Sequence, residues 1–490
     1  MSRRVAFTLA ACTLPALLSG CGSSGNPNEV QIAFIGSPKQ LVEKGLRLSP
    51  PGQQVRAATT AGLVALDAKG EVVPALAERW IVTEDGLSYI FRVRDSDWPD
   101  GKPLTAEQVR DSLKLTLRKL RGTSLGLDLA SISDIRTMTG RVIEIDLSSP
   151  VPDFLQLLTQ PELGITYRGQ VAGPMAVSTA QSDGDVVLKP MPPEKRGLPA
   201  QHNWEKSVRE LQIRALPARD AMKAFYSGDV DVVFDGRLAD LPLADTGPLS
   251  RGTVRIDAAM GLFGLRVLRD DGPLGDPVRR EALAMAIDRQ GLLSPFNVAG
   301  WLPSTRIIPV SLLGPGASER WPNLSLEQRR NIARERIAAW TRAGNSADVR
   351  ISLPEGPGSQ KLFNELAKSW AAIGVTAELV APGKQADLAM VDALARFGGP
   401  RWFLDQFNCG VRKLLCSPEA DALVREAVNE ADPEKHRTDL LEAETRLMAN
   451  EGFIPLGAPV RWSLVRGDVP GFAPNRWATH PLFPLAIDPK

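Results

Sequence analysis

The chain has 490 residues, of which 43% are hydrophobic and 23% are charged. This length exceeds what one hydrophobic core supports and predicts two or three domains, while the composition excludes a disordered, collagen-like or coiled-coil protein. The 58 Lys and Arg against 57 Asp and Glu are too evenly balanced to build a broad basic field, so we expect no nucleic acid among the partners.

The first twenty residues have the pattern of an export signal. Arg3 and Arg4 give a basic start, residues 5–18 form a mostly apolar run, and small residues precede Cys21. The run is shorter than the roughly 20 residues that span a bilayer. We therefore interpret residues 1–20 as a signal peptide.

The body of the chain alternates strand and helix patterns. Residues 209–216 predict a strand, and a short helix separates them from a second predicted strand at 229–234. Further along, strands at 349–353 and 375–380 enclose a helix at 359–373, whose apolar residues form one stripe. Such units are typical of largely parallel sheets covered by helices, so we expect an α/β fold.

Helix-capping residues mark three further helices. Thr105 and Gln108 make a capping box before a helix at 109–120. Ser417 and Asp432 each precede a proline, which places a capping side chain before a proline at the first helical position.

Cys409 and Cys416 are the two cysteines beyond the N-terminal segment. An exported protein meets an oxidising compartment, which favours a disulfide between them, although its short loop would stabilise the fold only modestly. A metal site is the alternative. His436 is the nearest histidine in the sequence and no CxxC pair occurs, so we expect a structural disulfide and no metal.

The sequence offers no convincing catalytic constellation. His202, His436 and His480 are scattered, and HExxH and P-loop patterns are absent. Asp229 and Asp231 alternate along a predicted strand, which favours solvated charges over an acid/base pair. We expect a protein that is not an enzyme and uses no cofactor; an extracytoplasmic enzyme with a carboxylate site is the alternative.

Three consecutive segments carry a family resemblance: residues 73–80 (VPALAERW), 85–94 (DGLSYIFRVR) and 98–109 (WPDGKPLTAEQV). This long ordered stretch resembles the signature of the peptide/nickel class of extracellular solute-binding proteins, which serve ATP-driven importers. Residues 227–231 (SGDVD) and 276–289 (DPVRREALAMAIDR) are similar to later landmarks of the same class.

The resemblance implies a two-lobed periplasmic-binding-protein fold with an extra subdomain inserted in the first lobe. On this basis, residues 29–262 plus 465–490 form lobe I, with the insertion at about 40–165, and residues 263–464 form lobe II. The ligand lies between the lobes, and their closure buries it.

The segment that ends at Cys21 resembles a bacterial lipobox, which implies that a lipid is attached to this cysteine. Residues 21–28 then form the anchor and a polar tether. An ordinary signal peptide followed by a chance cysteine is the alternative. We expect a protein held at the periplasmic or cell-surface side of a bacterial membrane, and Gly22 allows an anchor in the outer membrane.

The sequence departs from the family at a position where peptide binders carry an aspartate that pairs with the peptide's amino terminus. The corresponding stretch is residues 393–404, and Arg396 replaces that aspartate. A guanidinium repels an ammonium group, so we expect Arg396 to bind a carboxylate, phosphate or sugar hydroxyl instead. Alternatively, Arg396 points to solvent or pairs with Asp392 or Asp405.

Phe397 and Trp402 complete the predicted ligand site with Arg396 and Asp392, although both aromatic rings suit a hydrophobic core equally well. The favoured function is a monomeric, lipid-anchored solute-binding receptor that delivers a small polar or peptide-like ligand to an ABC permease in the membrane. A sensor or scaffold lipoprotein that keeps the fold without transport is the alternative.

Overall fold

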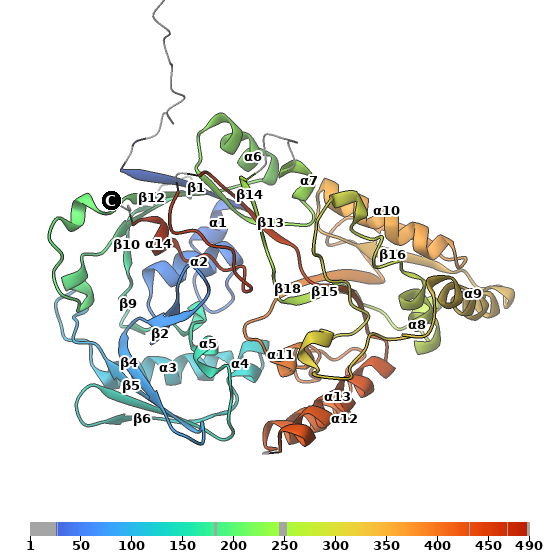
Figure 1. The fold of residues 1–490 in the computed structure, drawn as a ribbon, viewed down its shortest axis with the longest axis horizontal. Helices are drawn as coiled ribbons and strands as arrows, with labels where there is room; N and C mark the ends of the chain where they lie inside the picture. Colours follow the sequence, from blue (N-terminus) through green and yellow to red (C-terminus); the bar gives the residue numbers. More distant parts are fainter. Residues whose placement is uncertain are drawn as a thin grey trace, which may run out of the picture.

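The computed structural model forms two bodies that lie beside each other, each built on its own β-sheet (Figure 1). No helix in the described ranges combines the length and the apolar composition that crossing a bilayer demands. The described ranges are residue 26 and residues 28–180, 184–244, 252–430, 432–467 and 469–487.

The first body is centred on a seven-stranded mixed sheet with strands from both ends of the chain. In spatial order these are β10 (Met175–Ala180), β11 (Val186–Pro190), β12 (Glu210–Leu216), β1 (Glu29–Ile35), β13 (Val232–Arg237), β20 (Arg461–Val465) and β14 (Val254–Asp257). β1 pairs in parallel with β12 and β13. Between these two neighbours the chain forms α6 (Ala218–Ser227), which ends at Gly228 in the left-handed conformation (φ 90°).

A four-stranded antiparallel sheet lies in the sequence between β1 and β10. In spatial order its strands are β4 (Ala77–Val82), β5 (Ser88–Val93), β7 (Val142–Leu147) and β6 (Ile132–Met138). Helix α3 (Ala106–Leu120) contacts it and begins at the predicted capping box, where the backbone N of Thr105 donates to Oε1 of Gln108 at 3.1 Å. This sheet lies within the range expected for the inserted subdomain.

The first part of the range expected for the inserted subdomain belongs to the first body instead. Helices α1 (Pro38–Leu41) and α2 (Pro50–Thr59) bury Leu41, Val55 and Ala58 in the core of the seven-stranded sheet. Shorter elements then lead from α2 to β10: β2 (Val64–Leu66), β3 (Val72–Pro74), α4 (Ser124–Asp128), α5 (Phe154–Leu158), β8 (Thr166–Tyr167) and β9 (Gln170–Val171).

The second body is centred on a five-stranded sheet. In spatial order its strands are β17 (Thr376–Val380), β16 (Asp348–Ser352), β18 (Leu388–Leu394), β15 (Gly261–Val267) and β19 (Phe453–Gly457). Its helices are α8 (Pro277–Ala286), α9 (Leu326–Arg342), α10 (Pro357–Ala371), α11 (Pro400–Asp405), α12 (Pro418–Val428) and α13 (Pro433–Ala449). The predicted apolar stripe of α10 is buried in the core through Leu362, Leu366 and Trp370.

Two short segments connect the bodies. The chain leaves the first sheet after β14 and enters the second at β15, and it returns between β19 and β20. The return comes earlier than the expected boundary after residue 464, because Arg461–Val465 pairs with β13 and β14 in the first sheet.

The inserted subdomain and the second body share one hydrophobic core. Leu125 and Leu129, at α4, belong to the same buried cluster as Trp402 and Phe403 of α11. Helices α4 and α11 are in contact, and Figure 1 shows them side by side at the junction. The two bodies therefore meet at this junction as well as at the two connecting segments.

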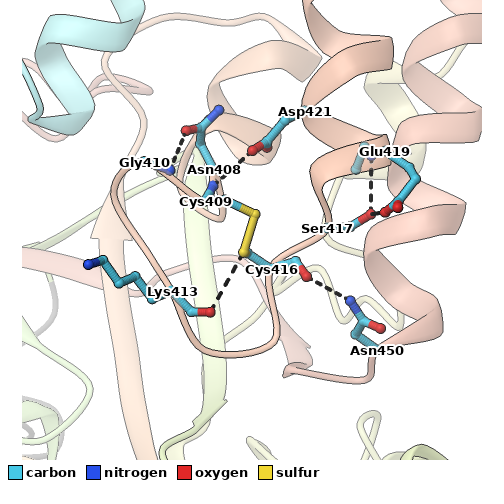
Figure 2. The surroundings of a disulfide bond; sticks show 10 residues. Asn408, Cys409, Gly410, Lys413, Cys416, Ser417, Glu419, Asp421 and Asn450 are labelled. Atoms are coloured by element: carbon cyan, nitrogen blue, oxygen red, sulfur yellow. Dashed lines mark hydrogen bonds between the residues drawn. A yellow bond between two sulfur atoms is a disulfide. The ribbon is translucent and has the colours of Figure 1, made fainter.

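A disulfide joins Cys409 to Cys416 in the loop before α12, with the two Cα atoms 5.3 Å apart (Figure 2). Hydrogen bonds fix both ends of the loop to neighbouring helices. The backbone N of Cys409 donates to Oδ2 of Asp421 at 2.9 Å, and Nδ2 of Asn450 donates to the carbonyl of Cys416 at 2.9 Å. The disulfide closes a small loop beside α12 and α13.

Candidate ligand-binding site

A cavity of about 2130 Å³ lies at the junction of the two bodies. The seven-stranded sheet, α2 and the inserted subdomain supply most of its wall, and the second body contributes residues 392–396. Pockets for drug-sized ligands measure roughly 300–1,000 Å³. The cavity therefore has room for a ligand larger than a single amino acid.

Four charged side chains line the cavity where β13, β20 and the end of β18 meet. Nη1 of Arg461 binds Oδ1 of Asp392 at 2.7 Å, and Nη2 of Arg237 lies 3.6 Å from Oδ1 of Asp235. Arg237 and Arg461 are directly opposite each other in the β13–β20 register. Because two carboxylates face two guanidinium groups, this part of the wall is close to electroneutral.

The backbone of β13 is irregular at this cluster. Asp235 has a positive φ of 65°, and the register with β20 shifts between Val233 and Gly236. A Cβ at Gly236 would lie 2.2 Å from the ring of Trp462, so only glycine fits there. At this bulge the side chain of Asp235 is largely buried, with 11% of its surface exposed.

Burial governs the ionisation of the carboxyl groups at this end of β13. It raises the pKa of Asp235, and the charges of Arg237 and Arg461 oppose that rise. Burial also raises the pKa of the nearby Asp240 to about 6, with Arg237 again acting in the opposite direction. Arg237 thus favours the ionised form of both carboxyl groups, and Arg461 favours that of Asp235.

Arg396 lies on the cavity wall, but the inserted subdomain holds its guanidinium group. Nε donates to Oδ2 of Asp128 at 2.6 Å, and Nη2 donates to Oγ of Ser124 at 2.6 Å. Neither carboxylate considered from the sequence is its partner, because Asp392 binds Arg461 and Asp405 lies 3.5 Å from Nε of Arg401. Arg396 therefore joins the second body to the subdomain.

Phe397 and Trp402 are packed in the hydrophobic core, with 3% and 1% of their surfaces exposed. Trp402 makes an edge contact with Phe403, with ring centroids 5.0 Å apart. Both rings fill the core that α11 shares with the subdomain. This corrects the expectation that they line the cleft.

Several polar residues of the cavity wall were not predicted from the sequence. Nε2 of His480 lies 3.2 Å from Oδ2 of Asp257, and both side chains are buried. The described residues contain no group of three or more His, Cys, Asp or Glu side chains placed to bind a metal ion. Cys21, the predicted lipid-attachment site, lies outside the described residues. The polar residues of this wall are brought together by contacts between residues far apart in the sequence, so no local sequence motif predicts them.

A large cavity between two α/β bodies, joined by two short connecting segments, is the architecture of a two-lobed periplasmic binding protein. The family of bacterial extracellular solute-binding proteins, family 5 (middle region), matches residues 71–412. The chain belongs to this family, which confirms the resemblance found in the sequence.

Individual relatives agree with this assignment. The periplasmic oligopeptide-binding protein OppA of Salmonella typhimurium is 23% identical over 470 residues, covering 84% of this chain and 83% of OppA. The nickel-binding periplasmic protein of Escherichia coli is 24% identical over 416 residues, covering 80% and 74%. The solved structure of the E. coli murein tripeptide binding protein MppA matches with a TM-score of 0.78 at 19% identity, covering 94% and 98%. The expected two-lobed fold is confirmed.

Proposed function

We propose that the protein is an extracytoplasmic receptor that is anchored by a lipid on Cys21, binds a polar or peptide-like solute between its lobes and delivers it to an ABC importer. The cavity at the junction of the two bodies carries the proposal. Because its wall includes groups from both sheets, a bound solute would stabilise the closed arrangement by contacts to both lobes.

The ligand we propose is not a peptide held by its free amino terminus at residue 396. That position presents a guanidinium already paired with Asp128, so it offers no carboxylate to hold an ammonium group. The nearby carboxylate of Asp392 is neutralised by Arg461. A solute with acidic or hydroxyl groups suits this wall better than a cationic one.

Native mass spectrometry of the mature domain, purified gently from its own host, tests the proposal. We expect a stoichiometric small molecule that denaturation releases for identification. Ala65 lines the cavity on β2, so Ala65→Trp should fill part of the space and abolish co-purification. Ala339, an exposed residue of α9, supplies the matched control, and Ala339→Trp should keep the molecule.

Other results would contradict the proposal. A protein that carries no molecule, and binds none from a broad panel of peptides, sugars and organic acids, would favour the sensor or scaffold alternative. Release of a peptide with a free amino terminus would refute the argument about residue 396, and turnover of a bound solute would indicate an enzyme.

A further inference from the structure

Two arginines lie together at one part of the cavity wall, Arg94 directly after β5 and Arg196 at the end of the 3-10 turn Pro193–Arg196. Gly197 brings the two segments into contact. A Cβ at this glycine would lie 2.9 Å from Cγ of Arg94 and 2.2 Å from the carbonyl of Asp95, and its φ is 69°. Only a glycine at position 197 therefore allows the two segments to approach so closely.

Within the described part of the chain, neither guanidinium group has a carboxylate partner. Two nearby acidic side chains bind other arginines: Glu78 binds Arg92 at 2.7 Å, and Asp95 binds Arg141 at 2.8 Å. The Nε atoms of Arg94 and Arg196 are buried without a hydrogen-bond partner among these residues, and so is the hydroxyl of Ser96 on the same wall. Unpaired buried donors of this kind cost free energy unless a ligand binds them.

The surroundings also disfavour two adjacent positive charges. Burial lowers the pKa of Arg94, with Glu78 opposing, and burial together with the charge of Arg94 lowers the pKa of Arg196. The guanidinium of Arg196 lies 4.7 Å from the ring centroid of Phe483 and 5.6 Å from that of Trp204. The two rings thus hold the planar group in place.

We infer that Arg94, Arg196 and Ser96 form a subsite for an oxyanion, the carboxylate or phosphate group of the bound solute. Guanidinium groups bind both kinds of group in a bidentate manner, and an anion between the two arginines removes their repulsion. The inference rests on the proposed function, since it assigns one part of the same cavity, and it gives the solute an acidic group at this point.

Thermal unfolding and calorimetric titration of the intact protein with succinate or inorganic phosphate test the subsite, with chloride of equal ionic strength as reference. Arg94→Gln and Arg196→Gln should each weaken anion binding at least tenfold. Arg118, exposed on α3 and away from the cavity wall, provides the matched control, and Arg118→Gln should bind as the wild type does. The anion with the higher affinity distinguishes a carboxylate from a phosphate ligand.

Stability without the anion separates a binding role from a structural one. Relief of the repulsion should leave the melting temperature of Arg196→Gln unchanged or higher, and Arg196→Lys should bind the anion with intermediate affinity. Wild-type protein that shows no specific anion effect, or variants that bind the anion as the wild type does, would overturn the inference. If the co-purified solute binds wild type and variants equally, the subsite is refuted while the receptor function stands.

Discussion

Arg396 forms an ion pair with the buried Asp128, a residue 268 positions earlier in the chain. Asp128 is 1% exposed, and its backbone carbonyl accepts a further hydrogen bond from Nη2 of Arg401 at 2.8 Å. Burial raises the pKa of Asp128, and both arginines act to lower it. In family peptide binders the residue at this position contacts the ligand. Here Arg396 instead binds Asp128 of the same chain, across the contact between the subdomain and the second body.

Replacing the buried carboxylate should destabilise the protein. Asp128→Asn leaves the partly buried guanidinium of Arg396 without its counter-charge, and the loss of one partner of such a pair costs up to about 3 kcal/mol. Urea unfolding followed by circular dichroism measures the change. As a control, Asp100→Asn removes the exposed pair with Lys102 and should leave the midpoint unchanged. Equal midpoints for Asp128→Asn and the wild type would contradict the structural role of the pair.

Stability should depend on pH through Asp405. Burial raises the pKa of this carboxyl to about 7, Arg401 opposes the rise, and Asp128 and Asp421 add to it. Because the folded state holds the proton more tightly than the unfolded chain, this contribution to stability is complete below about pH 4 and is lost as the pH rises through about 7. Relative to Asp405→Asn, the free energy of unfolding should fall by up to about 1.4 kcal/mol per pH unit between about pH 5 and 7. Parallel pH profiles for the two proteins would refute this prediction.

The disulfide should stabilise the fold by a small amount. Cys409 and Cys416 are separated by 7 positions, and the closure of so short a loop contributes about 2 kcal/mol in the chain-entropy account. Cys409→Ser/Cys416→Ser should therefore unfold at a lower urea concentration, and reductant should shift the wild type but leave the double variant unaffected. A wild-type protein whose two thiols react with a thiol reagent before reduction would show that the bond is absent.

Membrane attachment should depend on Cys21 alone. Cys21→Ser removes the thiol that the lipobox resemblance marks for lipid attachment, so the protein should lose incorporation of labelled palmitate and move from the membrane fraction to the supernatant. Its ligand affinity should be unchanged, because the cavity is built from residues beyond the tether. Unaltered fractionation of the variant would argue for the ordinary signal peptide.

Regular elements with an apolar period were predictable from the sequence. Strand β12 and helix α10 lie within two residues of the ranges expected at 209–216 and 359–373. The strand expected at 229–234 is displaced to Val232–Arg237, because its last residues are charged and line the cavity. The run of apolar residues ends at Phe234, where the strand meets the site, so it could not indicate the strand's end.

The polar wall of the site was less predictable. The departure at Arg396 was visible only by comparison with the family, and nothing local to residue 396 points to Asp128. The pairing of Arg461 with Asp392 likewise joins residues 69 positions apart. Such contacts depend on how the two sheets and the inserted subdomain pack against one another. Short-range sequence patterns do not predict that packing.

The place of β20 in the first sheet has a consequence for the order of folding. This strand fills the position between β13 and β14, and its Trp462 donates a hydrogen bond to the carbonyl of Arg237, 225 residues earlier. The second sheet, by contrast, is built entirely from the continuous stretch between β15 and β19. When the chain emerges from its amino end, all strands of the second sheet are present before β20. The second body can therefore complete its sheet first, although it comes later in the sequence, and the first body can complete its sheet only after β20 has emerged.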